Sequence, residues 1–280
     1  MKAIVSGLFT VMMLAFLPSC NKKQEVTVND ITFDTISVAK YYHLNNDSTL
    51  PSCNIDIILL YPDHFADDKV LPVLQKFVVS AMFDGNYSGM PVEEAIKKYI
   101  DNYIKNYTED AKQYLDERLY SEMDAKDRYF SYYEELSNSV LFNSANLLSM
   151  QFVQSSKKGN NRTYRQFSNY VIDLTTGKPL KETDIFNEGY ETILNRVFKE
   201  KLFAANKVSS IYDLEDLGYF GIEEIMPNNN FSIDKDGITY IFNKGEYSVL
   251  QSDEIRIFIP FEEIPHLLKE QSPVSVLLQQ

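Results

Sequence analysis

The spacing of apolar residues alternates along this chain between the period of a β-strand and that of an α-helix. Over residues 92–115 apolar side chains recur at steps of three and four, which predicts an amphipathic helix. Within residues 31–61 and 128–174, several segments instead carry aromatic and β-branched residues at every second position, as is typical of strands. Helical spacing returns over 190–225 and strand spacing over 231–259. This order predicts an α+β fold with antiparallel sheets and packed helices, rather than a doubly wound α/β fold.

Turn and capping residues mark where these elements begin and end. A further helix is predicted over 67–83, and Pro91 suits the first turn of the helix that follows it. The polar run 45–48 predicts a hairpin between the first two strands. Asp236 with Gly237 predicts a tight turn. We also expect a short closing helix over 261–268.

The first twenty residues are typical of an export signal rather than of a folded segment. Lys2 precedes an apolar run of about a dozen residues, which is too short to span a membrane. The run is followed by a small residue and Cys20, which resembles the bacterial lipobox. This resemblance implies cleavage before Cys20 and acylation of its thiol. Attachment by more than one acyl chain would be durable.

These signals divide the chain into four parts. Residues 1–20 are the predicted lipoprotein signal peptide, and residues 21–30 are a polar tether between lipid and fold. Residues 31–160 are predicted to form an N-terminal α+β subdomain. Residues 161–280 are predicted to form a second α+β subdomain, closely associated with the first. Each would mix helices with antiparallel strands.

Net charge limits the partners that the protein can have. The chain of 280 residues carries a formal charge of −13, so nucleic acid and anionic lipid surfaces are poor partners. A cationic protein would be attracted instead. Because no second apolar stretch of spanning length follows the signal, we expect contact with the membrane through the lipid on Cys20.

The cysteine content excludes a disulfide framework within the chain. Cys20 and Cys53 are its two cysteines, and once Cys20 carries lipid, Cys53 has no mate in the same chain. Cys53 stands beside an apolar run, so we expect a buried thiol rather than a reactive nucleophile.

The sequence contains none of the motifs that define common catalytic and cofactor sites. HExxH, CxxC, a Gly-rich phosphate loop and GxSxG are all missing. Glu263 and His266 stand three apart on a predicted helix, as in di-metal bundles, but without a second copy we expect a solvated helix face. We therefore expect no cofactor, no metal and no catalytic residue. Scattered carboxylates could still form a hydrolytic site without any motif.

Aromatic residues supply the candidate ligand contacts. The chain has 19 tyrosines and 18 phenylalanines. Tyr99, Tyr103 and Tyr107 form an i, i+4 ladder that could stack sugar rings, but a stripe at helical spacing is more often core. A second tyrosine cluster and a polar loop provide the candidate ligand contacts, which are Tyr129, Tyr132, Tyr133, Lys157, Lys158 and Asn160.

Two blocks in the C-terminal half resemble an exported bacterial domain family. The first is Tyr170–Lys178 followed by Thr183–Phe186, and the second is Asp236–Asn243 followed by Ile255–Phe261. The family includes the extracellular sensing domain of the anti-sigma factor RsiV and the accessory domain of the peptidoglycan deacetylase PdaC. The resemblance implies a shared fold over roughly 165–268. It implies no reaction, because the residues of these blocks build strands and turns.

Together these features predict a lipid-anchored binding module of the cell envelope. It would recognise a secreted protein, such as a lysozyme-like hydrolase, or a cell-wall glycan, and it would not be an enzyme. Asn21, Lys22 and Lys23 lack the acidic cluster that resembles surface-export signals, which favours the periplasmic side. Two alternatives stay open: a hydrolase of envelope polysaccharide or peptidoglycan, and a purely structural envelope lipoprotein.

Overall fold

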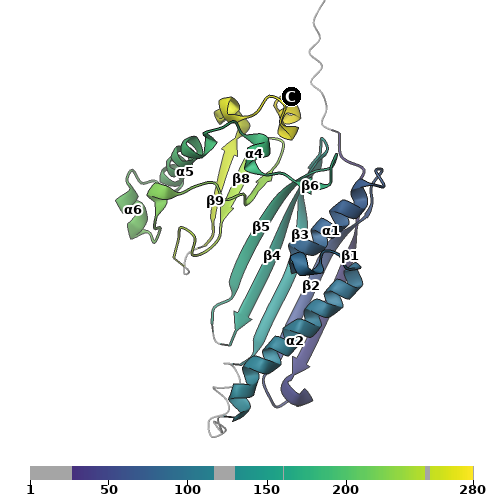
Figure 1. The fold of residues 1–280 in the computed structure, drawn as a ribbon. Helices are drawn as coiled ribbons and strands as arrows, with labels where there is room; N and C mark the ends of the chain where they lie inside the picture. The colour runs from purple at the N-terminus through teal and green to yellow at the C-terminus, as the bar shows by residue number, and fades with distance from the viewer. Residues whose placement is uncertain (1–26, 117–129, 160, 250–252, 280) are drawn as a thin grey trace, which may run out of the picture.

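The computed structural model shows a mixed α+β fold of two sheets with helices packed against them, which confirms the predicted class (Figure 1). The structure describes residues 27–116, 130–159, 161–249 and 253–279. The predicted signal peptide with its Cys20, and the candidates Tyr129 and Asn160, lie outside the described residues. Within the described part of the chain, no helix is long and apolar enough to cross a membrane.

A six-stranded sheet forms the larger part of the fold, and its strands lie in sequence order. Neighbouring strands pair antiparallel except β2 and β3, which are parallel. This pair departs from the all-antiparallel expectation because the helical segment between the two strands returns the chain to the same end of the sheet. The strands are β1 (Thr32–His43), β2 (Ser52–His64), β3 (Tyr132–Ser144), β4 (Leu147–Lys158), β5 (Tyr164–Asp173) and β6 (Lys178–Pro179).

Two helices, α1 (Val70–Phe83) and α2 (Val92–Asp116), cover one face of this sheet (Figure 1). Alternate residues of β2 from Cys53 to Leu59 are buried, because successive strand side chains point to opposite faces. Three of them, Ile55, Ile57 and Leu59, share a core with Leu74 of α1 and Ile96 of α2. As predicted, α2 begins directly after Pro91 and runs through the expected apolar stripe.

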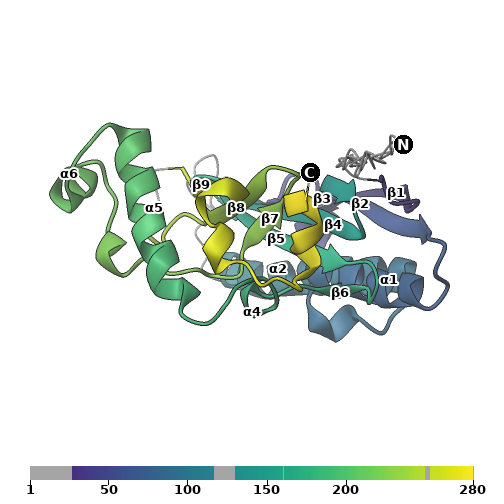
Figure 2. The ribbon, with the colours of Figure 1, turned by 90° about the horizontal axis from the view of Figure 1, so that it is seen from above.

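The C-terminal lobe is built on a three-stranded antiparallel sheet of β7 (Phe231–Ile233), β8 (Gly237–Phe242) and β9 (Ile255–Pro260). Helix α5 (Tyr190–Asn206) buries Leu194, Phe198 and Leu202 against this sheet. The rings of Phe198 and Tyr240 meet edge to face, with their centroids 5.0 Å apart. Two short helices, α4 (Glu182–Ile185) and α6 (Ile211–Asp216), flank α5, and α6 lies at the opposite end of the molecule from α1 (Figure 2).

Glycine and proline shorten two of the predicted helices. Helix α6 ends at Asp216 instead of continuing to residue 225, since Gly218 and Gly221 adopt φ angles of 91° and 64°. The predicted closing helix is replaced by two 3₁₀ turns, Phe261–Glu263 and Pro265–Leu267. Pro265 has no N–H with which to continue a helix.

As a result, Glu263 and His266 do not share a helix face, and the solvated helix face expected there is not formed. They lie in separate 3₁₀ turns. Glu263 instead accepts a hydrogen bond from Lys201, with its Oε1 2.7 Å from the Lys201 Nζ. The described residues contain no group of three or more His, Cys, Asp and Glu side chains that could hold a metal ion.

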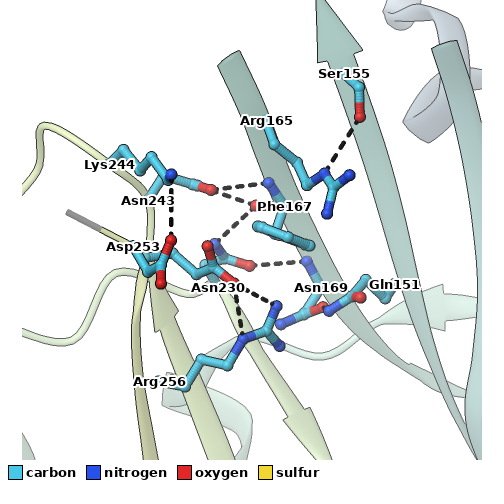
Figure 3. Close-up of polar contacts among 11 residues, drawn as sticks. Gln151, Ser155, Arg165, Phe167, Asn169, Asn230, Asn243, Lys244, Asp253 and Arg256 are labelled. Atoms are coloured by element: carbon cyan, nitrogen blue, oxygen red, sulfur yellow. Dashed lines mark hydrogen bonds and ion pairs between the residues drawn. The ribbon is translucent and has the colours of Figure 1, made fainter. Parts of the chain in front are cut away.

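Side-chain amides join the two lobes along the outer edge of β5 (Figure 3). Asn243 accepts a hydrogen bond from the Phe167 N–H at 2.8 Å and donates to the Phe167 carbonyl at 3.0 Å. Asn230 donates to the same carbonyl at 3.0 Å and accepts from the Asn169 N–H at 2.8 Å. The amides thus occupy backbone groups of β5 that a further strand would otherwise pair.

A buried serine makes a second connection between the lobes. The Ser149 hydroxyl, on β4, donates to the carbonyl of Ile233 at 2.6 Å and accepts from its N–H at 3.0 Å. The predicted boundary at residues 160 and 161 falls between β4 and β5, which pair in one sheet. The large sheet therefore continues past that position to Pro179, and the C-terminal lobe attaches to its last long strand.

We predict that Asn243→Ala lowers the free energy of unfolding by about 2 kcal/mol, since it leaves the buried N–H of Phe167 without its acceptor. Asn161→Ala, at an exposed position, is the matched control and should change it by less than about 0.5 kcal/mol. Urea unfolding measures both. Equal midpoints for the two variants would show that the amide contact does not stabilise the fold.

A second prediction concerns the turn between β7 and β8. A Cβ added to Gly237 would lie 2.3 Å from the Ile259 carbonyl oxygen, whereas one added to Gly85 would meet nothing within 4 Å. Gly237→Ala should therefore destabilise the protein by about 2 kcal/mol more than Gly85→Ala. Thermal unfolding of the two variants tests this, and comparable melting temperatures would contradict it.

Candidate functional site

Two of the predicted ligand contacts lie side by side at the end of the large sheet. Tyr132 begins β3 and Lys158 ends β4, and the two residues are cross-strand partners. The Lys158 ammonium lies 4.9 Å from the centre of the Tyr132 ring, as in a cation–π contact. Both side chains also approach Asp110 of α2: the Tyr132 hydroxyl donates to its Oδ2 at 3.4 Å, and the Lys158 Nζ lies 3.9 Å from that atom.

These residues line a cavity of about 490 Å³ between α2 and the sheet, which we call the tyrosine pocket. Helix α2 contributes one wall, with the tyrosines of the predicted ladder at three successive turns. Strand β3 contributes Tyr132 and Glu134, which point to the same face because they are two residues apart. The full lining is Asp84, Tyr87, Tyr99, Asn102, Tyr103, Lys105, Asn106, Tyr107, Asp110, Tyr132, Glu134 and Lys158.

The tyrosine ladder belongs both to the core and to the pocket. Tyr107 is only 1% exposed, and its ring packs edge-on against Tyr132 with centroids 5.3 Å apart. Tyr99 and Tyr103 are partly buried against the main core but also line the cavity. The core role predicted for the stripe is therefore present, and the same side chains supply the aromatic wall of the pocket.

Glu134 is the buried acid of the pocket. Its residue is 7% exposed, and its Oε1 accepts a hydrogen bond from the Tyr99 hydroxyl. Burial raises the pKa of the Glu134 carboxyl above its ordinary value of 4.5, although the hydrogen bonds from Tyr99 and Gln154 and the charge of Lys158 oppose the shift. A carboxyl in this setting can gain or lose a proton closer to neutral pH than an exposed one.

The phenols around Glu134 stay protonated at neutral pH. Burial raises the pKa of both Tyr99 and Tyr103 far above 10, and the nearby Glu134 charge raises it further. Neutral tyrosines offer a flat apolar face together with a hydroxyl that can donate and accept hydrogen bonds. The pocket thus combines aromatic faces, carboxylates and amides, which suits a polar ligand with apolar faces.

The backbone is strained at one edge of the pocket. Asp84, which follows α1, adopts φ 91° and ψ 170°, a region populated almost entirely by glycine. Its carboxylate accepts a hydrogen bond from the Asn86 N–H at 2.7 Å, which holds the local turn. Beside it, the Asn102 amide donates to the Tyr87 hydroxyl at 3.0 Å. These contacts fix the positions of polar groups on this side of the cavity.

The other described candidates lie on the opposite face of the sheet. Tyr133 and Lys157 are cross-strand partners, displaced by one residue from the pocket pair, and so point away from α2. The Tyr133 hydroxyl donates to Glu135 at 2.9 Å, and its pKa is raised to about 12, chiefly by desolvation and also by Glu135. The structure therefore separates the predicted cluster into two surfaces.

Cys53 is buried, as expected from the sequence. It is 1% exposed within a small core beneath the pocket, and desolvation raises the pKa of its thiol to about 12. At neutral pH the thiol is therefore protonated, which disfavours nucleophilic chemistry.

Sequence reasoning did not identify Glu134, Asp110 or Asp84 as site residues. The alternation of β3 places Glu134 on the same face as Tyr132, so that pairing was accessible from the sequence. The approach of α2 to β3 could not be predicted from the sequence. Residues 117–129 separate the two elements, and no local pattern specifies how they pack.

Comparison with protein families finds a match in the C-terminal lobe. Residues 183–262 match the DUF3298 family, which is described as a protein of unknown function. This segment spans the lobe from α4 to the turn after β9. No curated protein matches the chain. The tyrosine pocket lies outside the matched residues.

Two solved structures are similar in fold to most of the chain. A DUF3298 family member from Bacteroides fragilis has a TM-score of 0.82 and 29% sequence identity, and the match covers 90% of this chain and 98% of that one. A DUF3298 family protein from Pseudomonas aeruginosa has a TM-score of 0.55 and 13% identity, covering 85% and 94% of the two chains. Residues 183–262 thus match the model of the DUF3298 family, whose function is unknown, and the chain is similar to two structures of that family.

Proposed function

We propose that this protein is a lipid-anchored binding module of the cell envelope that holds a cell-wall glycan in the tyrosine pocket. The observation that carries the proposal is the lining of that cavity, in which tyrosine rings, two amides and three carboxylates surround about 490 Å³. Sugar rings present apolar C–H faces and a rim of hydroxyls. Aromatic faces match the first and carboxylate or amide groups match the second.

The position of the pocket suits a protein that is tethered at its N-terminus. The first described residues join the sheet at the far end of β3, where the Ala145 N–H donates to the Thr27 carbonyl at 3.0 Å. Tyr132 lies at the other end of this strand of 13 residues, and a strand of that length spans roughly 40 Å. Acylated Cys20 would thus leave the pocket on the side facing away from the membrane.

We predict that Tyr132→Ala weakens the binding of soluble cell-wall glycan fragments by about tenfold or more, since it removes an aromatic wall of the pocket. Tyr133→Ala is the matched control, because it removes the same side chain from the next residue on the opposite face. Isothermal titration calorimetry measures both. Equal losses in the two variants, or no glycan binding by the wild-type protein, would contradict the proposal.

The experiment includes a secreted protein as a separate arm, because RsiV-like sequence blocks and net charge favour a cationic partner. A pull-down with lysozyme tests it. The wild-type protein and Tyr132→Ala could capture lysozyme equally well while neither binds glycan. That result would show that the binding surface lies outside the tyrosine pocket. The surface around α6 is then the first to examine, since Tyr212 is 79% exposed there beside Asp213 and Glu215.

A second candidate function is hydrolysis of an envelope glycan, and the environment of Glu134 favours it. A buried carboxyl with a raised pKa suits a general acid, and Asp110 and Asp84 line the same cavity. The release of reducing ends from peptidoglycan measures this activity. Glu134→Gln should abolish release while keeping glycan binding. No release by the wild-type protein would exclude the candidate.

The pH dependence of the free energy of unfolding should show the protonation of Glu134 without any ligand. The folded-state pKa lies above the ordinary value of 4.5, so the stabilising contribution is present below that pH and is lost as pH rises through the raised pKa. We predict that wild type loses stability relative to Glu134→Gln as the pH rises above 4.5 and through the raised pKa of Glu134. Urea unfolding at a series of pH values measures this. If the free energies of unfolding of wild type and Glu134→Gln changed in parallel with pH, Glu134 would have an ordinary pKa.

A further inference from the structure

A second cavity, of about 680 Å³, lies between the two lobes. One side is the start of β5, with Thr163 and Arg165, and the other is the end of α5 and the strands of the C-terminal lobe. Arg165 pairs in register with Ser155, on the face of the large sheet that α1 and α2 leave uncovered. The cleft and the tyrosine pocket are therefore on opposite faces of that sheet.

Three basic side chains reach this cleft from three different elements (Figure 3). Arg165 comes from β5, Lys244 follows β8, and Arg256 comes from β9. Two acids, Asp253 and Glu254, also line the cleft. A local excess of positive charge is unusual for a chain whose net charge is −13.

The two acids compensate only part of this charge. Arg256 is well paired: its Nε and Nη2 lie 3.1 and 2.9 Å from the Oε1 of Glu254. Lys244 is 21% exposed, and its Nζ lies 3.4 Å from Asp253, a side chain that is 96% exposed. Such a surface pair contributes little, because solvent screens it. Arg165 donates to the Ser155 hydroxyl at 3.4 Å and forms no ion pair with any described residue.

We infer that this cleft is a binding site for a ligand with a carboxylate or phosphate group, held by Arg165 and Lys244. The guanidinium of Arg165 presents a planar fork of donors that matches the two oxygens of such a group. Leu202, Ala205 and Ile255 line the same cavity and would contact an apolar part of the ligand. This site is separate from the tyrosine pocket and does not rest on the function proposed for it.

The joint between the lobes fixes the geometry of the site before any ligand binds. Lys244 directly follows Asn243, whose amide is hydrogen-bonded to both backbone groups of Phe167. Arg256 lies over the Phe167 ring, with its guanidinium carbon 4.6 Å from the centroid. The cations from the C-terminal lobe are thus positioned against the strand that carries Arg165, so little ordering is needed on binding.

Titration of the full chain with four probes tests the inference. The dipeptide N-acetyl-Ala-Ala supplies a carboxylate and its C-terminal amide is the neutral control, while glycerol phosphate supplies a phosphate and glycerol is its control. We expect saturable binding of one anion but not of its neutral control. Binding should weaken as salt increases. Saturation by the dipeptide alone assigns a carboxylate ligand, and saturation by glycerol phosphate alone assigns a phosphate.

Variants then locate the site. Arg165→Gln should weaken anion binding by about tenfold or more. Arg165→Lys keeps the charge but loses the planar fork of donors, so its affinity for the anion should lie between those of Arg165→Gln and wild type. Lys235→Gln is the control, because it removes the same charge from an exposed position of the C-terminal lobe outside the cleft. Equal effects of Arg165→Gln and Lys235→Gln, or no saturable binding of either anion, would overturn the inference.

Discussion

The structure depends on how the outer edge of β5 is closed. An open strand edge would expose unpaired N–H and carbonyl groups, and here the side-chain amides of Asn230 and Asn243 take them up at Phe167 and Asn169. Two asparagines thereby replace a further strand. Because an amide is both donor and acceptor, one Asn side chain satisfies both backbone groups of one residue. This contact covers the edge of β5 and attaches the C-terminal lobe beside the cleft that both lobes line.

The parallel pairing of β2 and β3 shapes the face of the large sheet that α1 and α2 cover. Parallel neighbours require a crossover connection, and α1 and α2 form the described part of it. The crossover lays α2 along the sheet, so that Tyr99 and Tyr103 lie over Glu134. The tyrosine pocket therefore forms at the end of the sheet remote from Thr27. The pocket is thus a product of topology, since its two walls are distant in sequence.

The tyrosine pocket and the cleft relate differently to residues 183–262, which match the DUF3298 family. The tyrosine pocket is built entirely from residues before 183, whereas the cleft takes Arg165 from the large sheet and Lys244 and Arg256 from the matched segment. The Bacteroides fragilis structure matches both lobes, since the match covers 90% of this chain. The large sheet and the C-terminal lobe therefore occur together in that structure as well.

Local sequence patterns determined the α+β class, most helices and strands, the burial of Cys53 and the aromatic stripe of α2, because period, capping and turn chemistry act over a few residues. They also placed Tyr132 and Lys158 among the candidate contacts. The same patterns grouped Tyr133 and Lys157 with them, although a shift of one residue in a strand sends a side chain to the other face. Only the tertiary structure brought Glu134 against Tyr99 and Asn243 against Phe167, and placed Arg165 in the same cleft as Lys244. Those contacts follow from the packing of elements far apart in the chain, which no short-range pattern encodes.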